Sequence, residues 1–100
     1  MADQKLRIVA TIKVKPESRD QNLISAFKAL VEETKKEEGN ISYILHNDVK
    51  DPNTFVFVEE WRSPADIEKH MKSAHFTGFV GKLKAHLVAA PQIVTIRPLL

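Results

Sequence analysis

The alternation of apolar and polar positions along the chain predicts several strands. Four segments either are apolar at every second position or are rich in β-branched and aromatic residues, and each ends at proline or polar residues. A period of two is typical of a strand, because successive side chains point to opposite faces of the sheet. The predicted strands are residues 6–14, 41–47, 54–61 and 92–97. Polar residues 48–53 separate the middle two strands, which we therefore expect to form a hairpin.

Apolar residues recur at helical spacing between these strands. Residues 18–21 have the pattern of a capping box, and they predict a first helix that ends at Gly39. Ser63 and Pro64 suit the cap and the first turn of a second helix. Its periodicity breaks near residues 73–75 and then resumes, which predicts a third helical segment.

The spacing also predicts which helical faces are buried. The second helix should bury a stripe formed by Ile67, His70, Met71 and Ala74. Charged residues 35–38 fill the last turn of the first helix, and we interpret them as a solvated surface.

The order of these elements predicts an α+β fold of the ferredoxin-like split βαββαβ type, with helices on one face of a four-stranded antiparallel sheet. We expect a single domain over residues 1–100, because this length suits one core. Strands 54–61 and 92–97 carry apolar side chains on both faces, whereas helices from one chain cover only one face. A symmetric homodimer that packs sheet against sheet is therefore expected. The alternative is a second face left partly open to water.

Composition narrows the classes of partner. Lys and Arg total 15 against 13 for Asp and Glu, and the net charge of +2 comes from interspersed signs, so nucleic acid is not an expected partner. No apolar run approaches the roughly 20 residues needed to span a bilayer, so membrane insertion is not expected. The chain has no cysteine, which agrees with a cytoplasmic location and removes thiolate chemistry.

The candidate functional groups are concentrated in the second half of the chain. Glu59 lies on the same strand face as aromatic residues that include Trp61, where a carboxylate needs a partner or a raised pKa. His70 should point toward the sheet, either as a proton acceptor or as the hydrogen-bonding partner of Glu59. His75 and Phe76 lie at the predicted helix break, which could be the mouth of a pocket or only a capping turn.

Familiar cofactor motifs are missing from the sequence. There is no GxGxxG, GxxxxGK[ST], GxSxG, HExxH or CxxC pattern. The four histidines do not occur at i, i+4 spacing on one helix, so no preformed metal site is expected.

The sequence resembles the antibiotic biosynthesis monooxygenase family over nearly its whole length. The residues that carry this resemblance are Glu38-Gly39, Tyr43, Pro52-Asn53, the strand 55–61 with its Glu-x-Trp, and then His70, Ser73 and His75-Phe76. The resemblance implies a dimeric ferredoxin-like α+β barrel. It also implies the oxygenation of a small quinol or phenolic substrate by O₂ without a metal, flavin or haem cofactor.

The resemblance suggests roles for individual residues. His70 would be the catalytic base and Glu59 would orient it. The walls of an aromatic-binding cavity would come from Tyr43, Trp61, Phe76 and Phe79, with His75 near its mouth. Such a site is chemically sufficient, because an electron-rich phenol, once deprotonated, can itself pass an electron to O₂.

Two other classes of function stay open at this point. Relatives of this kind also isomerise or epimerise small carbonyl-rich signalling metabolites with similar acidic and histidine residues. A dimer that binds a small hydrophobic ligand without catalysis would use the same pocket.

Overall fold

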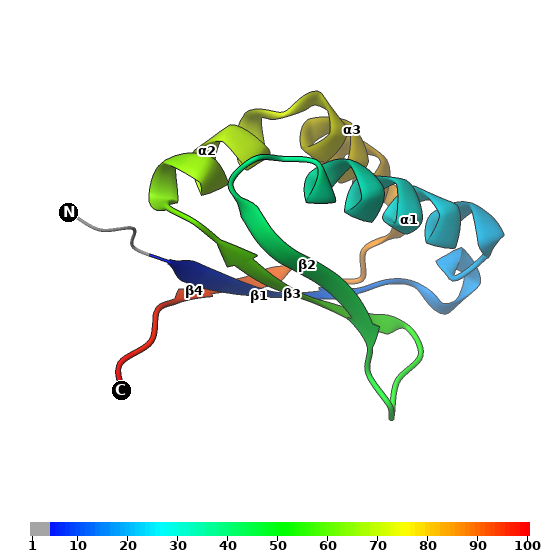
Figure 1. The fold of residues 1–100 in the computed structure, drawn as a ribbon. Coiled ribbons are helices and arrows are strands. Elements are labelled where there is room, and N and C mark those ends of the chain that lie inside the picture. The colour runs from blue at the N-terminus through cyan, green and yellow to red at the C-terminus, as the bar shows by residue number, and fades with distance from the viewer. Residues whose placement is uncertain (1–4) are drawn as a thin grey trace.

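The computed structural model describes residues 5–100 as a four-stranded antiparallel sheet with its helices packed on one face (Figure 1). The elements in chain order are β1 (Leu6–Lys13), the 3-10 turn η1 (Pro16–Ser18), α1 (Gln21–Lys35), β2 (Asn40–Asn47), β3 (Thr54–Trp61), α2 (Pro64–Lys72), α3 (Ala74–Leu83), the 3-10 turn η2 (Lys84–His86) and β4 (Gln92–Ile96). The strand order is β2-β3-β1-β4. This is the ferredoxin-like βαββαβ arrangement, so the predicted fold class is confirmed.

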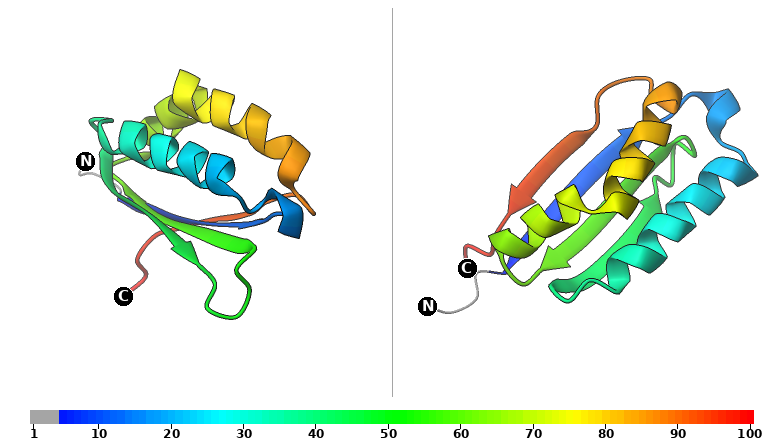
Figure 2. Two further views of the ribbon diagram at one scale, coloured as in Figure 1. Left: turned by 90° about the vertical axis from the view of Figure 1, so that its right-hand side faces the viewer. Right: turned by 90° about the horizontal axis from the view of Figure 1, so that it is seen from above.

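The helices divide the covered face of the sheet between them. Seen from above, α1 lies along the β2 side, whereas α2 and α3 lie toward β1 (Figure 2). The edge strand β4 is exposed at all five of its residues. Within residues 5–100, no helix combines the length and the apolar character that a membrane span requires.

The start of α1 differs from the prediction. Pro16 to Ser18 form a 3-10 turn, and the helix cap is Asp20, whose Oδ1 accepts a hydrogen bond from the backbone N–H of Leu23 at 2.9 Å. Ser18 is instead buried, where its hydroxyl bonds His86 Nδ1 at 2.9 Å. The predicted helix cap, Ser18, was therefore wrong by two residues, because the serine hydroxyl binds a residue far along the chain and not the first turn of α1.

The predicted boundaries around α2 are confirmed. Ser63 caps the helix and Pro64 occupies its first turn. Ser73 has an extended backbone with ψ of 152°, and it both ends α2 and caps α3 by accepting a hydrogen bond from the N–H of Phe76 at 3.2 Å. The predicted stripe is only partly buried, because Met71 and Ala74 are exposed at the point where the chain turns.

The two faces of the sheet have different surroundings. The alternate residues Phe55, Phe57, Glu59 and Trp61 of β3 are all buried under the helices. The opposite face carries one apolar residue from each strand in a single row, in the order Ile44, Val58, Val9 and Val94. Three of these four side chains are exposed. The aromatic face of β3 therefore looks toward the helices, and a largely apolar row lies on the open face.

Candidate active site

A cavity of about 370 Å³ lies between the sheet and the helices α2 and α3. Its walls are mostly apolar, and they include the inward-facing residues of β1, β3 and β4. The polar side chains among the lining residues are Tyr43, Glu59, His70, Lys84 and Thr95. A cavity of this size is in the range of small-molecule sites, where a few polar groups orient an apolar ligand.

Glu59 places a carboxyl group against this cavity. Its side chain is 5% exposed, and its Oε1 accepts a hydrogen bond from Trp61 Nε1 at 2.8 Å. Burial raises the pKa of Glu59 from 4.5 to about 7, against the opposing effect of the Trp61 hydrogen bond and with a smaller contribution from the Glu37 carboxylate. The carboxyl group can therefore both give and accept a proton near neutral pH.

His70 comes from the opposite wall, at the end of α2. Its ring packs against Trp61 and Phe76, each with 4.7 Å between ring centroids. Its Nδ1 is 2.7 Å from Glu37 Oε2. Burial lowers the pKa of His70, and the Glu37 carboxylate opposes that change. The ring is therefore held by tilted aromatic contacts and by one short hydrogen bond.

Glu37 is the residue that the sequence analysis missed. The prediction made Glu59 the partner of His70, but the partner in the structure is Glu37, which lies just beyond the end of α1. The same Oε2 atom also lies 2.7 Å from His75 Nε2. The prediction that the charged residues 35–38 form only a solvated surface is therefore wrong for Glu37. Helical periodicity could not predict this contact, because 33 residues separate Glu37 from His70 in the sequence.

The other predicted site residues have two different positions. Tyr43, Phe76 and Phe79 line the cavity together with Glu59 and His70. Trp61 and His75 do not line it. Trp61 is fully buried and binds Glu59, whereas His75 is on the side of His70 that faces Glu37.

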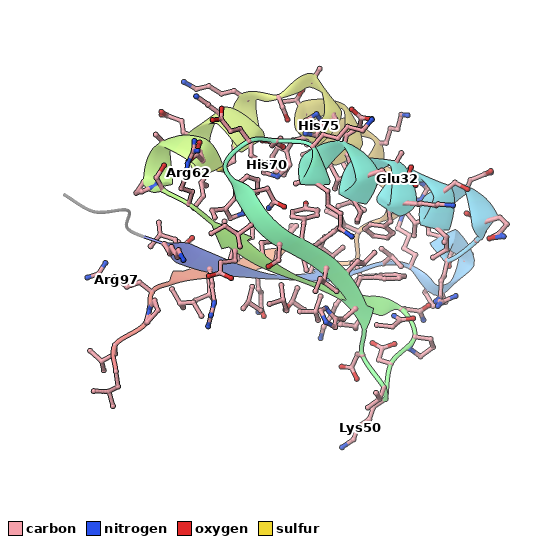
Figure 3. The ribbon with its side chains drawn as sticks, in the orientation of Figure 1. Glu32, Lys50, Arg62, His70, His75 and Arg97 are labelled. Atoms are coloured by element: carbon pink, nitrogen blue, oxygen red, sulfur yellow. The ribbon has the colours of Figure 1, made fainter. Side chains whose placement is uncertain are left out.

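Two further features complete the site. Burial raises the pKa of Tyr43 above its ordinary value of 10.0, so its phenol stays neutral even in alkaline solution. Glu37, His70 and His75 form the group of side chains within residues 5–100 that could hold a metal ion, since one ligand atom from each lies within 4.8 Å of the others. Figure 3 shows His70 and His75 at the junction of α2 and α3, near the end of α1.

Comparison with known proteins gives the class that this fold and cavity define. The family model described as antibiotic biosynthesis monooxygenase matches residues 6–82. The curated Bacillus subtilis (strain 168) protein "Putative monooxygenase YcnE" is 46% identical over 82 residues, which cover 82% of this chain and 84% of that protein.

Solved structures agree with this assignment. One described as an antibiotic biosynthesis monooxygenase is 34% identical, with a TM-score of 0.91 and coverage of 95% of this chain and 99% of that one. A conserved protein from Methanosarcina mazei Go1 is 33% identical, with a TM-score of 0.89 and coverage of 94% and 92%. The chain belongs to the antibiotic biosynthesis monooxygenase family.

Proposed function

We propose that this protein is a cofactor-independent monooxygenase that oxidises a small quinol or phenol with O₂. The observation that carries this proposal is the pair of proton-transfer groups, Glu59 and His70, on the wall of one largely apolar cavity. An apolar cavity accepts an aromatic ring, and buried proton-transfer groups act on its hydroxyl substituent without competing water.

His70 is the proposed base. A carboxylate only accepts hydrogen bonds, so the 2.7 Å contact to Glu37 requires the proton of the neutral imidazole to be on Nδ1. The lone pair is then on Nε2, the nitrogen that can take a phenolic proton. Glu37 acts as a positioning residue in this scheme, because it selects the tautomer without touching the substrate.

The substrate supplies the electrons for the reaction. The phenolate formed by His70 passes one electron to O₂, and the resulting superoxide and substrate radical combine to form a C–O bond. The peroxide anion so formed takes the proton back from the His70 imidazolium. The hydroperoxide on this ring carbon then loses the carbon-bound hydrogen and its terminal O–H as water, which leaves a carbonyl group. One oxygen atom enters the product and the other leaves as water, so a phenol becomes a quinone.

Glu59 is the proposed second proton carrier. Cleavage of the O–O bond needs a proton for the departing hydroxide, and a carboxyl group with a pKa of about 7 can supply it. The carboxylate that remains then takes the carbon-bound proton as the carbonyl group forms. The hydrogen bond from Trp61 keeps this carboxyl group at the cavity wall.

We also propose that the open sheet face binds a second copy of the chain. Ile44, Val58, Val9 and Val94 form a row across all four strands on that face. Arg7 and Glu60, whose charged groups lie 3.9 Å apart, are on the same face, so it carries both signs of charge beside an apolar centre. A two-fold axis lets such a surface serve both subunits.

The test is oxygen uptake with a panel of hydroquinones and naphthoquinols, followed by mass spectrometry of products formed under ¹⁸O₂. We expect uptake with at least one substrate and one labelled oxygen atom in its product. The substitution His70→Ala should abolish turnover, whereas Lys72→Ala, at an exposed position two residues further along α2, should not change it. Full turnover by the His70 variant would remove its role as base.

The same two groups favour one alternative, a proton-transfer isomerase that acts on a hydroxyketone. Glu59 and His70 both reach the cavity, and isomerisation needs a base and an acid around one carbon atom. Exchange of substrate hydrogen with deuterated water in the absence of O₂ would identify this activity. A ligand-dependent rise in Tm without either reaction would instead indicate a binding protein.

A further inference from the structure

We infer that Glu37, His70 and His75 form a binding site for one divalent transition-metal ion, and that the bound ion inactivates His70 as a base. The ligand atoms are Glu37 Oε2, His70 Nδ1 and His75 Nε2, all within 4.8 Å of one another. Two imidazoles and one carboxylate form a ligand set that suits Zn²⁺, Co²⁺ or Ni²⁺. Of the three ligands only His70 lines the cavity, so the ion would lie behind the cavity wall and not inside the cavity.

The fold brings the three ligands together from three segments. His70 lies in the last turn of α2, His75 lies in the first turn of α3, and Glu37 lies two residues beyond the end of α1. The extended backbone of Ser73 between the two histidines sets their relative orientation. Tilted ring contacts with Trp61 and Phe76, at interplanar angles of 41° and 55°, hold the His70 ring in place. Because the ligand side chains are already held in place, ion binding costs little side-chain conformational entropy.

The three ligand side chains differ in their exposure to solvent. The His70 side chain is 3% exposed, whereas those of Glu37 and His75 are 17% and 24% exposed. An ion can therefore approach from the Glu37 and His75 side while His70 closes the site from within. Water molecules would complete the coordination of the ion, because these residues supply three ligand atoms.

Binding exchanges hydrogen bonds for coordinate bonds. Glu37 Oε2 now accepts one hydrogen bond from each ring, at 2.7 Å in both cases. Each ring must release that N–H to offer a lone pair to the metal. Both rings stay neutral when the proton moves through solvent to the other ring nitrogen, which is Nε2 in His70 and Nδ1 in His75.

This change of tautomer connects the metal site to the cavity. With the metal on Nδ1, His70 Nε2 carries a proton and can donate but no longer accept. The ion would thus inhibit proton abstraction, and it would not act as a cofactor. This second part of the inference rests on the proposed function, whereas the binding of the ion does not.

Binding can be measured without substrate. Tag-free protein is titrated with Co²⁺, and the visible absorption of the ion is followed, with displacement by Zn²⁺ and calorimetry as checks. We expect saturation at one equivalent. His75→Ala and Glu37→Gln should each weaken binding by at least roughly tenfold. The control His46→Ala removes an exposed histidine outside the cluster and should leave binding unchanged.

Circular dichroism checks that each variant is folded, and the conservative Glu37→Gln change keeps the test valid if the alanine variant unfolds. A long-range ¹H–¹⁵N spectrum shows which nitrogen of His70 carries the proton, and Zn²⁺ should move that proton from Nδ1 to Nε2. Absence of saturable binding, or equal binding by wild type and the folded cluster variants, would overturn the site. An unchanged His70 tautomer with the site occupied would overturn the inhibition.

Oxygen uptake separates this inference from the proposed function. If a substrate is oxidised, Zn²⁺ should inhibit oxygen uptake by the wild type but not by a folded, active His75 variant. Full oxygen uptake by wild-type protein with Zn²⁺ bound would refute the inhibitory role of the ion. If no substrate is oxidised, the proposed function fails, while a saturable Co²⁺ spectrum still supports the site.

Discussion

The buried carboxyl group of Glu59 should make the protein less stable as the pH rises. A proton binds Glu59 more tightly in the folded chain, with a pKa of about 7, than in the unfolded chain, whose ordinary value is 4.5. The folded state therefore holds more protons between these two values, and its stability falls as the pH increases through that window. Above about pH 7 both states are ionised and the loss is complete.

The size of the effect follows from the same two values. The interval between 4.5 and about 7, at about 1.4 kcal/mol for each pH unit, corresponds to about 3–4 kcal/mol of lost stability. The substitution Glu59→Gln removes the ionisation and keeps an oxygen that can accept the Trp61 hydrogen bond. We expect the variant to match wild type near pH 4.5 and to exceed it by about 3–4 kcal/mol at pH 8.

The assay is chemical denaturation at a series of pH values between 4.5 and 8.5. Trp61 is the one tryptophan of the sequence and is fully buried, so its fluorescence reports unfolding directly. Glu68→Gln, at an exposed position of α2 and away from the open sheet face, is the control and should not produce the same divergence. Parallel stability curves for wild type and Glu59→Gln would refute the reasoning. If Glu59 also carries the proposed proton, the stabilised variant should turn over more slowly.

Three further pairs of substitutions, each a test with its comparison variant, probe separate parts of the structure. Glu37→Gln should lower kcat by roughly 100-fold with little change in KM and alter the His70 tautomer in ¹⁵N spectra, whereas exposed Glu38→Gln should do neither. Gly39→Ala should destabilise the fold by about 1–3 kcal/mol in thermal unfolding, because its methyl group would collide with the buried Asp66 side chain. The same change at Gly78, where a methyl group meets no atom within 4 Å, should instead stabilise α3 by about 0.5–1 kcal/mol; equal effects at both glycines would contradict the packing argument. Val58→Lys should convert the proposed dimer to a monomer in light scattering. The control Val49→Lys changes a loop residue that is 98% exposed, and it should leave the dimer intact. An unchanged mass for the Val58 variant would exclude this face as the interface.

Local patterns in the sequence account for most of the fold. Alternation along β3 places Glu59 and Trp61 on one face, and the structure buries both there. The Ser63-Pro64 start of α2 and the break at Ser73 were predicted because caps and turns depend on near neighbours. The hydrogen-bond partner of Glu59 could also have been predicted from near neighbours in the sequence. Trp61 lies two residues away on the same strand face, which is the spacing that brings an indole N–H to a carboxylate.

Long-range contacts could not be predicted in this way. Ser18 has the sequence context of a helix cap, but its hydroxyl binds His86, 68 residues further along the chain. Glu37 has the sequence context of an exposed charge, but it binds two histidines that are 33 and 38 residues away. In both cases the competing partner comes from an element whose position depends on the packed fold, so periodicity carries no information about it.

Glu37 shows how the end of one helix can control the chemistry of another. If α1 continued as a regular helix to Gly39, residue 37 would remain part of a charged helical face. Instead α1 ends at Lys35, and the following turn places the Glu37 carboxylate at the junction of α2 and α3. Gly39 allows the close approach of Asp66, at the start of α2, to this turn. The tautomer of His70, and with it the proton chemistry proposed for the cavity, therefore depends on where α1 stops.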